Sequence, residues 1–474
     1  MTRLGPLAAG GLIALALSAA GCPDRSISTV TPAPVAVSTK DIPLSADIDV
    51  LFVIDNSSST QDKQKVFADN YPKFVTALSG FPTGLPNLHL GVVTTSVDIG
   101  NSNLNPGSAC HPATGQDGLL QTTNLDLGFT CQGALAPVAG ERFLSDIGMP
   151  DGSRAINYTG GLDQALACIS HVGTAGCGFE SPLEAMERAL DGRHPENAGF
   201  LRDGAFLAVV ILTDEDDCSA KNELFQQPTT AVGDRDLRCS QQAYRCDQRL
   251  SPSQPGAYTN CTVRTDSSLI DPSTYASFLT GLKGSSNIAV AVIAGEPAQS
   301  LGIGPLTIGP VTQDLALLPS CMAKINGNDA IGRPALRLTS FLDNFGERGL
   351  FRTVCQADYA GALTDIGNLL IQAISPCIEG ALDTRDADPT NPGLQPDCTV
   401  SDIADAGDEH LIRPCHMLGP EQPDPDMGSA TACWWLKSDP AMCQTESQLA
   451  LQIERTVAAA PNTKTRVSCA LGAP

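Results

Sequence analysis

Continuous apolar runs alternate with amphipathic stretches along much of this chain, and the alternation predicts a parallel sheet covered by helices. Apolar runs rich in β-branched residues are typical of strands that are buried on both faces. The runs lie at 50–54, 88–96, 205–212 and 287–294. Stretches of helical periodicity lie at 67–78, 160–170, 181–191, 272–283 and 359–374. This order predicts an α/β fold with a three-layer, doubly wound sheet joined by right-handed crossovers.

Polar segments that contain cysteines interrupt this rhythm at about 97–160 and 215–265. Beyond residue 377 the pattern changes, because the chain becomes rich in Pro and Asp and shows no long helical period. We therefore predict one main domain at 47–377 that carries two insertions, followed by a small disulfide-rich region at 378–474. Trp434 and Trp435 are the only tryptophans. Adjacent residues on a strand face opposite sides, so we expect one of them in the core and the other in an exposed contact.

The first apolar run leads directly into a polar turn that could bind a metal ion. Open α/β sheets bind their ligands at the carboxyl ends of strands, which is where this turn lies. Asp55, Ser57 and Ser59 alternate along the turn and can direct one carboxylate and two hydroxyls at a common centre. Such an all-oxygen set suits a hard divalent cation. A helix cap is the alternative interpretation of this segment taken alone.

The apolar run at 205–212 also ends in an acidic turn, which opens with Thr213 and Asp214. With both turns in place, the sequence resembles the von Willebrand factor A (VWA) domain family over roughly 45–377. The metal-ion-dependent adhesion site of that family combines D-x-S-x-S, a separate loop residue and an aspartate after a central strand. The resemblance implies that Asp214 contacts the metal, usually through water. The three acidic residues that follow it are expected to be a solvated loop: Glu215, Asp216 and Asp217.

The separate loop ligand is open between two residues of the segment that precedes the helix at 181–191. Thr174 has the chemistry that the family uses, whereas Glu180 stands at the better distance ahead of the helix. A ligating Glu180 would add negative charge and weaken the attraction of the ion for an incoming carboxylate. Alternatively, Glu180 belongs to the first turn of the helix, where the helix dipole favours an acidic residue.

The resemblance implies a binding protein, not an enzyme, whose partner protein offers a carboxylate to the ion. Mg²⁺ is the favoured ion, with Mn²⁺ or Ca²⁺ as alternatives. The alternative functions are a structural envelope protein with a vestigial metal site and a metal-dependent hydrolase. The sequence contains no H-E-x-x-H, G-x-S-x-G or P-loop motif. Its 29 basic and 52 acidic residues give a net charge of −23, which argues against a nucleic-acid partner.

The amino-terminal 22 residues have the features of a bacterial export signal, with an apolar stretch followed by small residues. The sequence A-A-G-C at 19–22 resembles a lipobox, in which the cysteine becomes the lipid-modified first residue. This implies a lipid anchor at Cys22, with a simple cleaved signal peptide as the alternative. Residues 23–46 are rich in Ser, Thr and Pro and are predicted to be a solvated tether. We expect a bacterial envelope protein that is lipid-anchored and either periplasmic or surface-exposed.

The number of cysteines agrees with export. Setting Cys22 aside from the 17 cysteines leaves an even 16, which suits complete pairing in an oxidising compartment. Short sequence intervals suggest three local bridges: Cys110 with Cys131, Cys168 with Cys177, and Cys433 with Cys443.

Overall fold

The structure is a computed structural model in which residues 37–474 form one compact unit. It describes residues 36–472 except 44–46, 82–83, 100–109, 111–115, 127–128, 132–134, 136, 139, 150, 222–223, 225–234, 252–253, 309–310, 384, 387, 405–406, 441–442, 444, 458 and 460–462. The predicted export signal, the lipidation site Cys22 and the first part of the predicted tether lie outside the described residues. In the described part of the chain, no helix is both long and apolar enough to cross a membrane.

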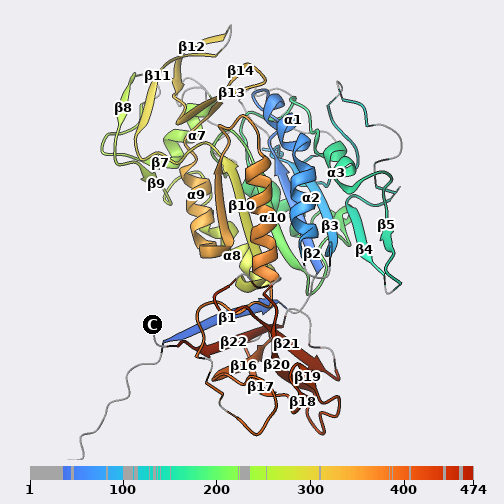
Figure 1. Cartoon of the computed structure of the whole chain (residues 1–474). Helices are drawn as coiled ribbons and strands as arrows, with labels where there is room; N and C mark the ends of the chain where they lie inside the picture. Colours follow the sequence, from blue (N-terminus) through green and yellow to red (C-terminus); the bar gives the residue numbers. More distant parts are fainter. Residues whose placement is uncertain are drawn as a thin grey trace, which may run out of the picture. The chain divides into compact units, whose positions relative to one another are not determined.

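A seven-stranded sheet forms the centre of the main domain, in the order β15-β10-β6-β2-β3-β4-β5 (Figure 1). Its parallel strands are β2 (Asp47–Ile54), β3 (Asn87–Thr94), β6 (Phe206–Leu212), β10 (Ile288–Ala294) and β15 (Gly349–Thr353). The edge strands β4 (Leu144–Gly148) and β5 (Arg154–Ile156) are antiparallel. The four predicted strands are thus present as β2, β3, β6 and β10.

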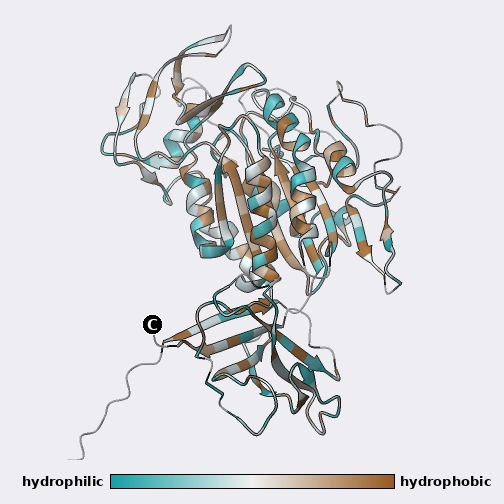
Figure 2. Cartoon of the chain, viewed as in Figure 1, coloured by the Kyte–Doolittle hydropathy of each residue, from teal (hydrophilic) through white to brown (hydrophobic). Residues whose placement is uncertain are grey.

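Helices cover both faces of this sheet, and alternate residues of each strand pack against them. On β2, Phe52 packs edge-on against the aromatic rings of Phe67, Tyr71 and Phe74. One face carries α1 (Gln61–Asp69), α2 (Tyr71–Ser79), α3 (Leu162–Ser170) and α10 (Ala360–Ile374). The other face carries α4 (Pro182–Leu190), α8 (Pro272–Lys283) and α9 (Leu336–Leu342). The three-layer doubly wound fold is therefore confirmed, and Figure 2 shows the central strands as mostly hydrophobic.

The predicted insertions add peripheral elements to this framework. The insertion at 97–160 supplies β4 and β5, which extend the central sheet. The insertion at 215–265 supplies α7 (Arg235–Ala243), β7 (Tyr244–Arg245), β8 (Gly256–Tyr258) and β9 (Thr262–Val263). Sequence patterns did not predict β11 (Leu301–Ile308), β12 (Val311–Leu317), β13 (Cys321–Ile325), β14 (Asn328–Gly332), α9 or β15. Among the described residues, this domain also contains short 3-10 helices: η2 (Pro195–Asn197), η3 (Ser285–Asn287) and η4 (Asp343–Arg348).

The carboxyl-terminal region forms a second sheet of six strands, in the order β1-β22-β16-β17-β20-β21. Its elements are β1 (Val37–Pro43), β16 (Cys398–Ile403), β17 (Glu409–Pro414), β20 (Ala432–Ser438), β21 (Leu449–Arg455) and β22 (Lys464–Ala470), with a hairpin of β18 (Met417–Gly419) and β19 (Gln422–Pro423). The predicted tether is wrong for β1, which pairs antiparallel with β22 along its whole length. The sequence of β1 has no apolar pattern, because it is rich in polar side chains and only Ile42 belongs to the core of this sheet.

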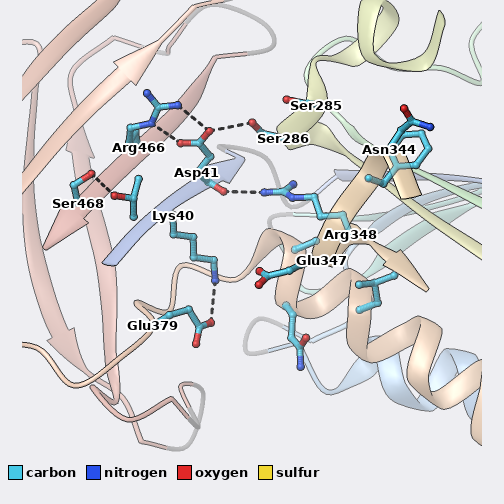
Figure 3. Close-up of a pocket in the computed structure, with 15 residues that line it drawn as sticks. Lys40, Asp41, Ser285, Ser286, Asn344, Glu347, Arg348, Glu379, Arg466 and Ser468 are labelled. Carbon is cyan, nitrogen blue, oxygen red and sulfur yellow. Dashed lines mark hydrogen bonds and ion pairs between the residues drawn. The ribbon is translucent and has the colours of Figure 1, made fainter. Parts of the chain in front are cut away.

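Strand β1 makes polar contacts both within the second sheet and with the main domain (Figure 3). The carboxylate of Asp41 is paired with Arg466 and Lys464 of β22, each at 2.8 Å. The guanidinium of Arg348 donates to the backbone oxygen of Asp41 at 3.1 Å, and Lys40 Nζ donates to the backbone oxygen of Cys377 at 2.9 Å. Along the chain, the main domain is inserted between β1 and the other strands of the second sheet. Polar contacts hold the junction between them.

All 16 cysteines after Cys22 form disulfides, which confirms the expectation of complete pairing. The bonds are Cys110–Cys177, Cys131–Cys168, Cys218–Cys239, Cys246–Cys261, Cys321–Cys355, Cys377–Cys443, Cys398–Cys469 and Cys415–Cys433. The predicted local pairings Cys110–Cys131, Cys168–Cys177 and Cys433–Cys443 are wrong. The first insertion folds back on helix α3 and on the segment before α4, so its cysteines meet partners that are more distant in sequence.

Candidate metal centre

The two predicted metal-binding turns meet at one edge of the central sheet. Strands β2 and β6 are neighbours, with Ile54 level with Leu212, and the backbone N–H of Asp55 donates to the carbonyl of Leu212 at 2.9 Å. From these strands the sheet is wound in opposite directions, toward β3 on one side and toward β10 on the other. Doubly wound sheets bind ligands at such a switch point, outside the carboxyl ends of the strands.

The four residues predicted from the two turns are linked by hydrogen bonds. Asp55 is fully buried, and its Oδ1 accepts from the Ser57 N–H at 2.8 Å while its Oδ2 accepts from the Thr213 hydroxyl at 2.7 Å. The Oγ atoms of Ser57 and Ser59 are 3.3 Å apart. Ser59 Oγ donates to Asp214 Oδ1 at 3.1 Å. The structure therefore brings one carboxylate and two hydroxyls of the first turn to the carboxylate of the second turn.

A lysine that sequence reasoning missed also enters this site. Lys63 Nζ lies 2.7 Å from Asp214 Oδ2 and donates to the Ser59 carbonyl at 3.0 Å. The side chains of this ion pair are 3% and 2% exposed. A signal for Lys63 was present in the sequence, because the residue lies three and four positions before Val66 and Phe67. That spacing places it on the buried face of α1.

The backbone around Asp55 is held by a buried glutamine. Gln64 Nε2 donates to the Asp55 carbonyl at 2.7 Å and to the Gly173 carbonyl at 2.8 Å. A second tie joins the Gly176 N–H to the Asn56 carbonyl at 2.7 Å. A Cβ at Gly176 would lie 2.2 Å from Asn56 Oδ1, so this approach requires a glycine. The loop that contains Thr174 is therefore fixed against the first turn.

The two candidate loop ligands have different surroundings. Thr174 is half-buried and follows the glycine that binds Gln64. Glu180 is 3% exposed and lines a small pocket together with Glu215, Asp216 and Arg333. Helix α4 begins at Pro182 after the cap position Ser181, so Glu180 lies outside the first helical turn. This corrects the helix-terminus interpretation of Glu180 and leaves the choice between Glu180 and Thr174 open.

The acidic residues after Asp214 are not the solvated loop that we expected. Asp217 forms a 2.8 Å ion pair with Arg337, in which both side chains are 0% exposed. Asp216 accepts backbone N–H donors from Arg337 and Leu338 at 2.8 and 3.0 Å. Glu215 pairs with Arg333 at 3.0 Å. These carboxylates fasten the chain after β6 to the start of α9 and to the segment before it.

The donor chemistry of the site fits a hard cation, although the site already contains a positive charge. Burial, followed by the nearby charge of Asp214, raises the pKa of Asp55 to about 6. At the end of β3, the Thr95 hydroxyl is fully buried and has no hydrogen-bond partner among the described residues. In the described part of the chain, no group of three or more His, Cys, Asp or Glu residues could hold a metal ion. An ion here would rely on two carboxylates, on serine hydroxyls and on water.

The strand order, the switch point and the D-x-S-x-S turn agree with the VWA-like fold that the sequence resemblance implied. No protein-family model and no curated protein matches this sequence. Among solved structures, the chain is similar to a von Willebrand factor type A protein from Catenulispora acidiphila, at 9% identity and a TM-score of 0.27, over 93% of this chain and 62% of that chain.

Two pilus adhesins are also similar to this chain. For SpaC from Lactobacillus rhamnosus GG in an open conformation, the identity is 10% and the TM-score 0.31, over 91% of this chain and 39% of that chain. For RrgA from Streptococcus pneumoniae, the identity is 11% and the TM-score 0.30, over 91% and 57%. The chain thus spans less than two thirds of each of these proteins.

Proposed function

We propose that this protein binds a partner protein through a divalent ion held by Asp55, Ser57, Ser59 and Asp214. The observation that carries the proposal is the hydrogen-bonded set of these four residues at the switch point of the sheet. Mg²⁺ is the favoured ion, and a bound Mg²⁺ would accept a carboxylate oxygen from the partner. Few anionic ligands leave the charge of such an ion incompletely compensated, which favours an anionic group on the partner.

The test is capture of binding partners from envelope extracts with and without a chelator. We expect the wild-type protein to retain a partner in Mg²⁺ and to release it in chelator, and the Asp55→Ala variant to retain none. Asp69→Ala is the matched control, because Asp69 lies on helix α1 with a side chain that is 59% exposed and pairs with Lys65. Retention that is equal with and without chelator would contradict the proposal.

The Lys63–Asp214 ion pair favours a second candidate function. An ammonium at Asp214 supplies positive charge inside the site, so the edge could be stable without an ion, as in a structural envelope protein with a vestigial site. Calorimetric titration of the wild-type protein separates the two functions. Heat of binding with Mg²⁺ or Mn²⁺ at millimolar concentration supports adhesion. Its absence in the wild-type protein supports the structural role.

We further propose that the protein is exported and held to the bacterial envelope by lipid on Cys22. Eight disulfides support an oxidising compartment. One acyl chain gives only marginal attachment, so stable anchoring requires the several chains of a mature lipoprotein. We expect Cys22→Ser to move the protein from the membrane fraction to the soluble fraction. Wild-type protein found wholly in the soluble fraction would contradict the anchor.

A further inference from the structure

A small apolar pocket lies in the carboxyl-terminal sheet, apart from the candidate metal centre. Its volume is about 180 Å³, and a cavity of about 150 Å³ is large enough to take up a benzene ring. The apolar part of its lining consists of Leu394, Pro414, Met417, Pro420, Trp434, Trp435, Leu436 and Leu449. A pocket with these walls suits one flat ring.

Gln395 is a polar side chain that lines this pocket. Its side chain is 9% exposed, and Nε2 donates to the Pro392 carbonyl at 3.1 Å. Oε1 is buried and has no hydrogen-bond partner among the described residues. A buried acceptor without a partner is costly, so such atoms usually mark a site for water or a ligand. Glu421 also lines the pocket and accepts from the Ser438 N–H at 2.9 Å.

The walls of the pocket are held in place without a ligand. The disulfide Cys415–Cys433 joins the segment before β18 to strand β20. Asn391 Nδ2 donates to the Cys415 carbonyl at 2.9 Å, and its Oδ1 accepts from the Met417 N–H at 2.7 Å. A site formed in advance avoids the ordering cost of binding.

We propose that this pocket binds a single aromatic ring that carries one O–H donor, as a tyrosine side chain does. The ring would pack between the tryptophans and the prolines. Its donor would satisfy Gln395 Oε1. This oxygen and the carboxylate of Glu421 are both acceptors, so a ring with a donor is preferred to one without. This site is independent of the metal centre and of the function proposed for it.

The two tryptophans of the chain both line the pocket, so their emission reports its occupancy directly. The purified protein is titrated with 4-methylphenol and, separately, with toluene, which has the same ring and methyl group but no donor. Free tryptophan amide under the same conditions corrects for collisional quenching. We expect a saturable change in emission and about tenfold tighter binding of 4-methylphenol, the ratio that one hydrogen bond of ordinary strength provides.

Gln395→Leu tests the donor contact. We expect this variant to bind 4-methylphenol and toluene with nearly equal affinity, while Gln422→Leu, a change at an exposed glutamine of the same region, keeps the preference. A cooperative urea unfolding transition like that of the wild-type protein shows that each variant is folded. No saturable change in the wild-type protein, or no preference for 4-methylphenol, would overturn the proposal.

N-acetyltyrosinamide identifies the source of the ring. Binding at least as tight as that of 4-methylphenol supports a side chain of a partner protein. Binding of 4-methylphenol alone supports a free small aromatic compound with the same donor chemistry and overturns the partner side chain.

Discussion

Two aspartates follow strand β6 within a few residues of each other, Asp214 and Asp217, and their surroundings differ. Asp217 is held by Arg337 and also accepts from the Leu183 and Ser219 N–H groups and the Ser219 hydroxyl. Asp214 instead faces a second carboxylate, Asp55, across hydroxyl groups, with Lys63 as the cation. The first arrangement pairs the buried carboxylate with a guanidinium and fixed donors. In the second, the ammonium of Lys63 pairs with Asp214, while Asp55 accepts hydrogen bonds from neutral donors.

The comparison indicates which aspartate supports the fold and which could bind a ligand. A buried charge that is fully paired and hydrogen-bonded is costly to disturb. At Asp55, burial and then the like charge of Asp214 raise the carboxyl pKa, so this site carries unfavourable interactions that a bound cation would relieve. We therefore expect changes at Arg337 to affect stability and changes at the Asp55 edge to affect ion binding.

The largest effect is expected from Arg337→Ala. The change leaves Asp217 buried without its cation, so the free energy of unfolding should fall by about 3 to 5 kcal/mol. Urea denaturation measures this loss. Arg193→Ala is the control, because Arg193 pairs with Asp191 at 2.6 Å but is 43% exposed. The control should lose under about 1 kcal/mol, and an equal loss in the two variants would remove the distinction between the two aspartates.

The second effect is complete loss of ion binding in Asp55→Ala. This variant removes one of the two carboxylates, and with it the repulsion from Asp214. The loss of two hydrogen bonds is thereby offset, and the free energy of unfolding should stay within about 1 kcal/mol of wild type. Calorimetric titration with Mg²⁺ measures the binding, and Asp69→Ala should bind like the wild-type protein. Full binding in Asp55→Ala would place the ion elsewhere.

Sequence patterns predicted the central fold well because its strands are continuous apolar runs. Figure 2 shows that the second sheet is more mixed in hydropathy. Strand β1 resembles a polar tether in sequence, since it places only Ile42 in the core and relies on pairing with β22. Strand β15 is half-buried throughout, so it lacked the apolar signature of the other parallel strands. The disulfide pairing followed the tertiary fold and could not be obtained from sequence intervals.

The sequence predicted that the residues of the two turns would lie together, but it did not predict the positive charge of Lys63 beside them. The D-x-S-x-S turn and Asp214 are adjacent because two neighbouring parallel strands end beside each other, which the strand pattern implied. Lys63 and Lys65 look alike in sequence, yet Lys65 is 58% exposed and Lys63 is buried against Asp214. Their positions on helix α1 differ, because Lys63 lies on the buried face and Lys65 on the exposed face. The ion pair itself depended on how close helix α1 lies to the second turn.

The third effect is a gain in ion affinity in Lys63→Met. The ammonium competes with a cation for Asp214 Oδ2, so its removal should tighten Mg²⁺ binding by about tenfold or more. Removal also leaves Asp214 unpaired, so added Mg²⁺ should raise the melting temperature more in this variant than in the wild-type protein. Lys65→Met is the matched control on the same helix and should leave both quantities unchanged. Equal ion affinity in Lys63→Met and wild type would show that the ammonium does not compete.

The smallest effect is expected from Glu180→Thr, which addresses the open choice of loop ligand. If Glu180 binds the ion directly, losing its charge lowers the intrinsic ion affinity. The less compensated ion then attracts a carboxylate more strongly. Calorimetric titration with Mg²⁺, followed by acetate in excess Mg²⁺, measures the two affinities separately, and we expect each to change by a few-fold. Thr174→Ala is the companion variant. If its Mg²⁺ affinity falls and that of Glu180→Thr does not, Thr174 is the ligand, and Glu180 belongs to the acidic pocket beside Arg333.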